Sequence, residues 1–120
     1  MTKKELVLKA AHAAADKKAE DIKVFDLHGL SSVTDYFVIC TGSTDIHVKA
    51  IRDEVHKQLK EQGVRPWHIE GMPAANWVLM DYVDFVVHIF QPETREFYSL
   101  ERLWGDAKIE TISEEYDDAS

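Results

Sequence analysis

The stretch Asp35-Tyr-Phe-Val-Ile-Cys-Thr-Gly-Ser43 decides the fold of this protein. Residues 36–41 form an uninterrupted run of aromatic, β-branched and small apolar side chains, which is typical of a strand buried on both faces. A glycine then ends the strand, and Ser43, Thr44 and Asp45 are each a candidate N-cap of a following helix. The pattern predicts a central strand that leads directly into a helix.

Helical periodicity marks the regions on either side of this strand. Thr2 and Glu5 have the spacing of a capping box, which predicts a first helix over residues 3–18. After the central strand, apolar residues recur with helical spacing, and charged residues occupy the other faces. These apolar residues are Val48, Ile51, Val55 and Leu59. The second helix is expected to end at Gly63, and both helices should pack on a sheet through their apolar faces.

The remaining segments complete an α/β (α+β) fold. Strand propensity is high in four further segments, namely residues 21–27, 66–70, 76–80 and 85–90. Pro92 begins a last helix, whose buried face is expected to contain Phe97, Leu100, Leu103 and Trp104. The order α-β-β-α-β-β-β-α predicts a mixed five-stranded sheet with helices packed on it.

Composition and charge limit the domain organisation and the class of partner. The 120 residues carry a formal net charge of −8, and we expect one domain over residues 1–108. Residues 109–120 contain several Asp and Glu but no Lys or Arg, which predicts an acidic, flexible tail. Because phosphate contacts need clustered Lys and Arg, the charge disfavours sequence-specific nucleic-acid binding and favours a basic protein partner.

The compartment follows from what the sequence lacks. Cys40 is the single cysteine, so an intrachain disulfide is excluded. The amino-terminal residues have no apolar run of the kind found in signal peptides, and no stretch has the length of a membrane span. We therefore expect a cytoplasmic protein without membrane contact.

The turn at Gly42-Ser43 raises the alternative of a nucleotide-binding or nucleotidyltransferase-type enzyme. Such enzymes hold phosphate at a helix N-terminus and bind divalent metal through carboxylates on adjacent strands. Here Asp53 and Glu54 fall in the middle of a predicted helix, while Asp81 and Asp84 fall in a predicted hairpin turn. The sequence thus predicts a nucleotidyltransferase-like fold without an active site, and no catalytic residue, metal ligand or cofactor.

Cysteine and histidine offer no better catalytic pattern. Cys40 lies inside the apolar strand, where thiols are usually inert. The histidines are scattered and lack the spacing of zinc ligands. His88, between two β-branched residues, is expected to be a hydrogen-bonded structural residue.

The segment from Trp77 to Asp84 has the composition of a binding surface. Strand alternation places Trp77, Leu79 and Asp81 on one face. Aromatic anchors beside charged residues are typical of protein interfaces, but the same apolar side chains would also fit beneath a helix. The residues alone favour the two interpretations equally.

The sequence also resembles the ribosomal silencing factors, the RsfS or Iojap family, over residues 3–105. The resemblance rests on the order and spacing of short motifs along the chain. These are Asp21-Ile22, Asp35-Tyr36-Phe37-Val38-Ile39, Gly42-Ser43, Ala50-Ile51, Glu70-Gly71, Trp77-Val78-Leu79, Asp81, Asp84, Val87-His88-Ile89-Phe90, Arg95, Phe97-Tyr98 and Leu100-Glu101-Arg102-Leu103-Trp104.

The resemblance implies a non-enzymatic translational repressor. Members of the family bind the large ribosomal subunit through ribosomal protein fourteen and block joining of the small subunit, notably under nutrient limitation. They are often homodimers when free, so a dimerisation module that buries the Trp77 surface is a further alternative.

Carried over to this chain, the resemblance implies a set of partner-binding residues. They are Trp77 and Leu79 as apolar anchors, Asp81 and Asp84 as partners of basic residues, and Glu70 and Tyr82 as further candidates. Many relatives have glycine where this chain has Val83. Because β-branched residues tolerate positive φ poorly, we expect the turn here to take another shape, such as type I.

Overall fold

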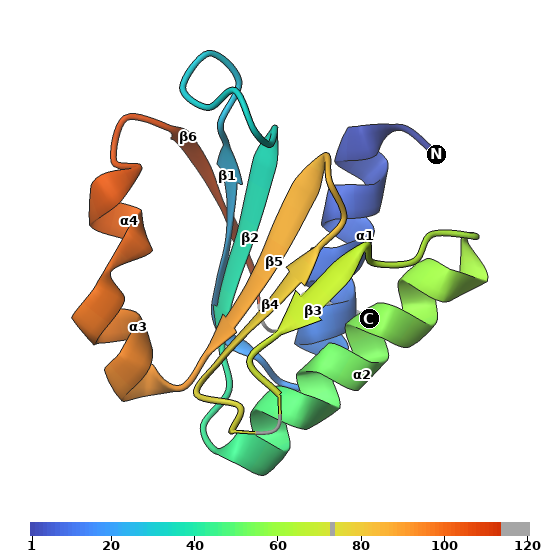
Figure 1. The fold of residues 1–120 in the computed structure, drawn as a ribbon, viewed down its shortest axis with the longest axis vertical. Helices are drawn as coiled ribbons and strands as arrows, with labels where there is room; N and C mark the ends of the chain where they lie inside the picture. The colour runs from blue at the N-terminus through green and yellow to red at the C-terminus, as the bar shows by residue number, and fades with distance from the viewer. Residues whose placement is uncertain (73, 114–120) are drawn as a thin grey trace.

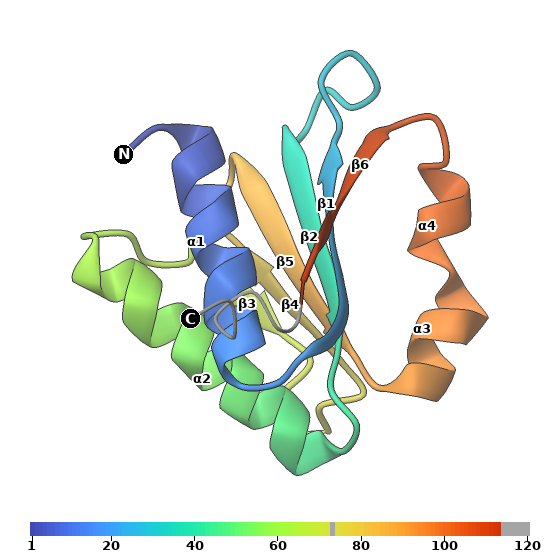
Figure 2. The same cartoon turned by 180° about the vertical axis from the view of Figure 1, so that it is seen from behind.

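The computed structural model describes residues 1–72 and 74–113. Along the chain, the elements are α1 (Lys3–Asp16), β1 (Glu20–Asp26), β2 (Tyr36–Thr41), α2 (Asp45–Glu61), β3 (His68–Glu70), β4 (Trp77–Asp81), β5 (Phe85–Phe90), α3 (Pro92–Tyr98), α4 (Leu100–Leu103) and β6 (Lys108–Ile112). The strands form one sheet in the order β3-β4-β5-β2-β1-β6. Helices α1 and α2 cover one face of this sheet, and α3 and α4 lie against the other (Figures 1 and 2).

The predicted α+β class and central strand are confirmed. Strand β2 occupies the middle of the sheet, parallel to β5 and antiparallel to β1. All other neighbouring strands pair antiparallel. The large core lies between the sheet and helices α1 and α2, and it contains Val38, Cys40 and the predicted apolar face of α2.

The predicted number of strands is wrong, because the sheet has a sixth strand. β6 pairs antiparallel with β1, with Val24 opposite Glu110. It covers residues 108–112, part of which were expected to belong to the acidic tail. Ile112 is 6% exposed and joins the large core. The unpaired edge of β1 offers backbone hydrogen bonds to this segment, a pairing between distant parts of the chain. Residues 114–120, the rest of the predicted tail, lie outside the described residues.

The predicted last helix is interrupted. Ser99 adopts a left-handed conformation, with φ 46°, and divides the segment into α3 and the single turn α4. The rotation between them exposes two residues of the predicted buried face, so Phe97 is 80% and Leu103 71% exposed. Leu100 and Trp104 still pack on a second, small core formed by Phe25, Leu27, Ile39 and Phe90.

The predicted capped starts of α1 and α2 are confirmed. The Thr2 hydroxyl accepts a hydrogen bond from Glu5 N, and Thr2 N donates to the Glu5 carboxylate, which completes the capping box. Among the three candidate caps of α2, Thr44 takes the role, since its hydroxyl accepts from His47 N at 3.1 Å.

Candidate partner-binding site

The sheet face that carries α3 and α4 is only partly covered, and an open groove remains beside these helices. The register of β4 on β5 places Leu79 opposite His88 and Asp81 opposite Val86. Strand β2 adds Phe37, opposite Val86 on the same face. The hollow has a volume of about 460 Å³. Its lining residues are Leu30, Ser31, Ser32, Val33, Thr34, Phe37, Leu79, Asp81, Val86, His88 and Trp104. We call this hollow the sheet groove.

Trp77 lies at the end of this face nearest α3 and is partly covered. Its ring stacks on Phe90 at a centroid distance of 4.9 Å and contacts Tyr98 of α3 at 4.8 Å. Its indole N–H donates to His88 Nδ1 at 3.1 Å. Trp77 therefore packs beneath a helix, as one of the two interpretations predicts, and part of its side chain stays exposed.

His88 is a buried structural histidine, as predicted. Its ring contacts Phe37 edge-on, with centroids 4.5 Å apart. Burial lowers the pKa of His88 to about 3, because an apolar environment disfavours the charged imidazolium. The ring is therefore neutral at physiological pH and accepts the indole N–H at Nδ1.

Asp81 stands where β4 enters its turn, and the predicted shape of this turn is wrong. Val83 has φ 73°, and Asp84 N donates to Tyr82 O at 2.9 Å. This is a γ-turn with positive φ, which is strained for a β-branched residue. The Asp81 carboxylate stabilises the turn by accepting from Val83 N at 2.7 Å.

Glu70 lies on the same face as Leu79. Strand β3 pairs Glu70 with Leu79 and His68 with Asp81. Both β3 side chains are exposed at the sheet edge, and the His68 ring is hydrogen-bonded to the Glu70 carboxylate. Glu70 therefore extends the groove face with negative charge.

Two of the six predicted site residues lie elsewhere. Tyr82 is 7% exposed and stacks on Phe85 in the large core, on the face of the sheet that α1 and α2 cover. Burial raises the pKa of the Tyr82 phenol. Asp84 is 3.7 Å from Lys3 Nζ, at the amino-terminal end of α1. The structure thus groups Glu70, Trp77, Leu79 and Asp81, and it separates Tyr82 and Asp84 from them.

A second hollow adjoins the sheet groove and contains a residue that the sequence did not single out. Trp67 is 77% exposed, and its backbone N–H donates to Asp81 O at 2.8 Å. The hollow has a volume of about 320 Å³ and is lined by Val33, Thr34, Trp67, Asp81, Val83 and Val86. Pro66, directly before Trp67, was the available signal, because proline within a strand segment indicates an edge. We call this hollow the Trp67 hollow.

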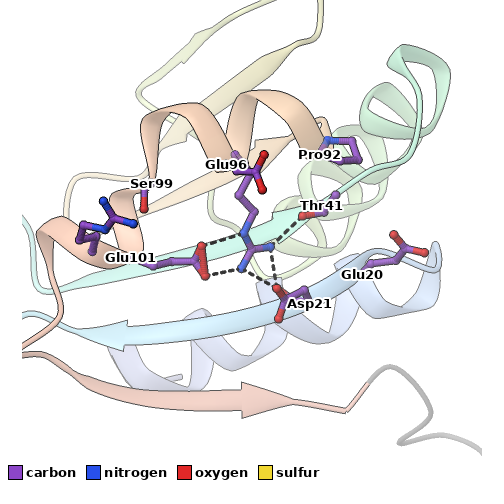
Figure 3. Close-up of a pocket in the computed structure, with 9 residues that line it drawn as sticks. Glu20, Asp21, Thr41, Pro92, Glu96, Ser99 and Glu101 are labelled. Atoms are coloured by element: carbon purple, nitrogen blue, oxygen red, sulfur yellow. Dashed lines mark hydrogen bonds and ion pairs between the residues drawn. The ribbon is translucent and has the colours of Figure 1, made fainter.

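Arg95 lines a further hollow, but its guanidinium is engaged in hydrogen bonds within the protein. Its guanidinium donates to both carboxylate oxygens of Glu101, at 3.1 and 3.0 Å, and to Asp21 O and Thr41 Oγ1, each at 2.8 Å. The dashed lines in Figure 3 show how these contacts tie α3 and α4 to β1 and β2. Arg95 lowers the pKa of the Glu101 carboxyl by hydrogen bonding. This cluster anchors the helices that border the sheet groove.

The Gly42-Ser43 turn is explained by packing. A Cβ on Gly42 would lie 2.8 Å from a methyl carbon of Val48, so this position requires glycine. The backbone N–H of Ser43 donates to His47 Nδ1 at 2.9 Å. This turn therefore joins β2 to α2 with its amide satisfied by a side chain.

Other candidate centres are inert. Cys40 is buried, and burial raises the pKa of its thiol to about 12. Within residues 1–72 and 74–113, no three His, Cys, Asp or Glu side chains are grouped so that they could hold a metal ion. No helix in the same part of the chain is long and apolar enough to cross a membrane.

Comparison with known proteins assigns the family. The profile described as "Ribosomal silencing factor during starvation" (RsfS) matches residues 1–120. The chain belongs to the RsfS family. It is 46% identical to ribosomal silencing factor RsfS of Bacillus subtilis over 109 residues, which cover 91% of this chain and 92% of that protein. A second RsfS, from Halalkalibacterium halodurans, is 43% identical over 107 residues, or 89% of this chain and 92% of its own.

The fold agrees with this assignment. A crystal structure of a protein from Chromobacterium violaceum superposes with a TM-score of 0.85 at 35% sequence identity, covering 94% of both chains. The RsfS-like motifs fall on the sheet groove and on the α3–α4 anchor, as well as in the core.

Proposed function

We propose that this protein silences ribosomes without catalysis, by binding the large subunit and blocking attachment of the small subunit. The observation that carries the proposal is the sheet groove, an open apolar surface bordered by Asp81 and Glu70 in a chain of the RsfS family. Occlusion needs only a stable complex at the joining surface, and this explains how a chain without a catalytic group can act.

The contact we propose is ribosomal protein fourteen of the large subunit. Leu79 and the exposed part of Trp77 are the apolar anchors, and Asp81 and Glu70 pair with basic residues at the rim. Asp84 and Tyr82 are left out of this set, because Asp84 pairs with Lys3 and Tyr82 is buried. We place this action in the cytoplasm and link it to nutrient limitation.

We further propose that the free protein is a homodimer. A second copy that covers the sheet groove would compete with the ribosome for one surface. Dimer dissociation would then precede silencing, and the apparent affinity for subunits would fall at high protein concentration.

Co-sedimentation with separated ribosomal subunits on a sucrose gradient tests the proposed function. We expect the protein to migrate with large subunits and to reduce the joined ribosomes formed when small subunits are added. Leu79→Asp should abolish both effects, because it places a charge in the apolar groove. Ile46→Ala, at an exposed position of α2, is the matched control and should behave as wild type. Migration of wild type with neither subunit would overturn the proposal.

A further inference from the structure

The sheet groove and the Trp67 hollow are two parts of one surface. Val33, Thr34, Asp81 and Val86 line both of them. Leu79, Phe37 and Trp104 make one end apolar, and Trp67 and Val83 make the other end apolar. A largely exposed tryptophan is unusual on a protein surface that contacts nothing, and such residues dominate protein interfaces.

Two buried polar atoms of this surface lack partners within the described residues. His88 Nδ1 accepts the Trp77 N–H, so the neutral ring carries its proton on Nε2. No acceptor for this Nε2–H, and no partner for Thr34 Oγ1, is present in the described part of the chain. Both residues are more than nine-tenths buried. Both atoms are enclosed by the protein and are out of reach of a docked partner, so neither is assigned to the contact. Because the two hollows share lining residues, one extended segment can span both of them.

The charge of Asp81 indicates which partner side chain would lie between the sheet groove and the Trp67 hollow. Asp81 lines both hollows, and its carboxylate accepts a hydrogen bond from the backbone of Val83. No ion pair joins Asp81 to a cation in residues 1–72 and 74–113. Its charge is therefore available to a Lys or Arg of the partner.

We propose that the sheet groove and the Trp67 hollow together bind one extended segment of a basic protein, in which a Lys or Arg at Asp81 lies between two apolar side chains. One apolar side chain fills the groove over Leu79, and the other packs on Trp67. This assignment rests on the proposed function and adds Trp67 to the site.

Affinity measurements with purified large ribosomal subunits test the contribution of Trp67. We expect Trp67→Ala to weaken binding of the full chain about tenfold or more, in the range of interface hot spots. Asp81→Asn should weaken binding and reduce its dependence on salt, while Ile46→Ala should bind as wild type. If Trp67→Ala binds as wild type while Leu79→Asp does not bind, this inference fails and the proposed function stands. If wild type does not bind, both fail.

Photo-crosslinking identifies the occupant directly. A benzophenone side chain placed at position 67 of the full chain, bound to large subunits, should form an adduct with a protein segment that contains a Lys or Arg between two apolar residues. An adduct with ribosomal RNA or with a second copy of this chain, or no adduct from a variant that still co-sediments, would overturn the inference.

Discussion

At the scale of the residue, the surface is shaped by local strain and by burial. Val83 adopts φ 73° in the turn between β4 and β5. The turn is imposed by the strands on either side, since Tyr82 N donates to Phe85 O and Asp35 N donates to Asp84 O. The hairpin register thus outweighs the conformational preference of one side chain.

Replacing Val83 by glycine should stabilise the protein. The left-handed region costs an L-residue roughly 1–2 kcal/mol, and the larger entropy of glycine in the unfolded chain offsets part of the gain. We expect the free energy of unfolding to rise by about 0.5–1 kcal/mol in urea denaturation. Val33→Gly, at an exposed residue without positive φ, is the control and should not stabilise. A loss of stability in Val83→Gly would show that the side chain contributes more than the strain costs.

Acidification should destabilise the protein through His88. The unfolded state binds a proton on this residue near its ordinary pKa of 6.5, whereas the folded state does so only at about 3. The unfolded state therefore binds more protons in this window, and stability falls as the pH falls from 6.5 towards 3. The expected slope is about 1 kcal/mol per pH unit.

Urea denaturation of wild type and His88→Gln between pH 7 and pH 5 measures this contribution. The variant should lose less stability on acidification than wild type. His56→Gln is the comparison and should reduce the pH dependence less than His88→Gln, because burial lowers the pKa of His56 but this residue is only partly buried. Equal pH dependence in wild type and His88→Gln would refute the assignment.

At the scale of the element, α3 and α4 depend on one buried arginine. Asp21 lies in an irregularity of the β1–β2 register and has φ 51°. Its carbonyl is thereby available to Arg95 rather than to the β2 ladder. The strand irregularity, Arg95 and Glu101 thus act together to fix the helices beside the sheet groove.

Removing this anchor should loosen α3 and α4. Arg95→Met leaves the Glu101 carboxylate without its bidentate partner, and we expect a loss of about 3 kcal/mol in the free energy of unfolding. Arg95→Lys should recover only part of this, since lysine cannot make the planar double contact. Hydrogen exchange of the α3–α4 amides should accelerate in both variants. Arg102→Met, at an exposed residue of the same hollow, should change neither measurement.

At the scale of the whole molecule, charge should govern how quickly the protein finds its partner. The net charge of −8 favours approach to a basic protein surface and opposes approach to bare phosphate. Since the acidic groups of the proposed site are few, most of this long-range field comes from the rest of the chain. The long-range attraction that sets the association rate can therefore be changed without changing the contacts of the bound complex.

The association rate with isolated ribosomal protein fourteen should consequently fall as salt rises, while the dissociation rate changes less. Stopped-flow or surface-based kinetics at about 50 and 200 mM salt would measure both rates. Glu61→Gln, at an exposed residue at the end of α2, should lower the association rate slightly and leave dissociation unchanged. A salt effect confined to dissociation would contradict electrostatic steering.

Much of the fold could be predicted, because the relevant signals are local. The bounds of β2 agree with the apolar run of residues 36–41, and the capping residues Thr2 and Thr44 act within three residues of their own positions. The spacing of apolar residues and the capping of helices both depend on residues that are close together in the chain. The motifs of the RsfS family are likewise a property of the order of residues.

The candidate site was predicted in part. Strand alternation places Trp77, Leu79 and Asp81 on one face, and the register confirms this. The same alternation, continued through Tyr82, would have placed that side chain on the opposite face with Met80. The exposure of Trp67 depends on β3 being the edge of the sheet, for which Pro66 was a local signal, although it does not single out Trp67.

The sequence by itself determined the class of fold, both long helices, the strand β2 and the family. Only the tertiary structure decided that β6 completes the sheet, that Ser99 breaks the last helix, and that Trp67 meets Asp81 beside an open groove. The physical reason is the range of the interactions. Helix caps and strand alternation are encoded within a few residues, whereas the pairing of β6 with β1 and the anchor of Arg95 on β1 join segments more than seventy residues apart.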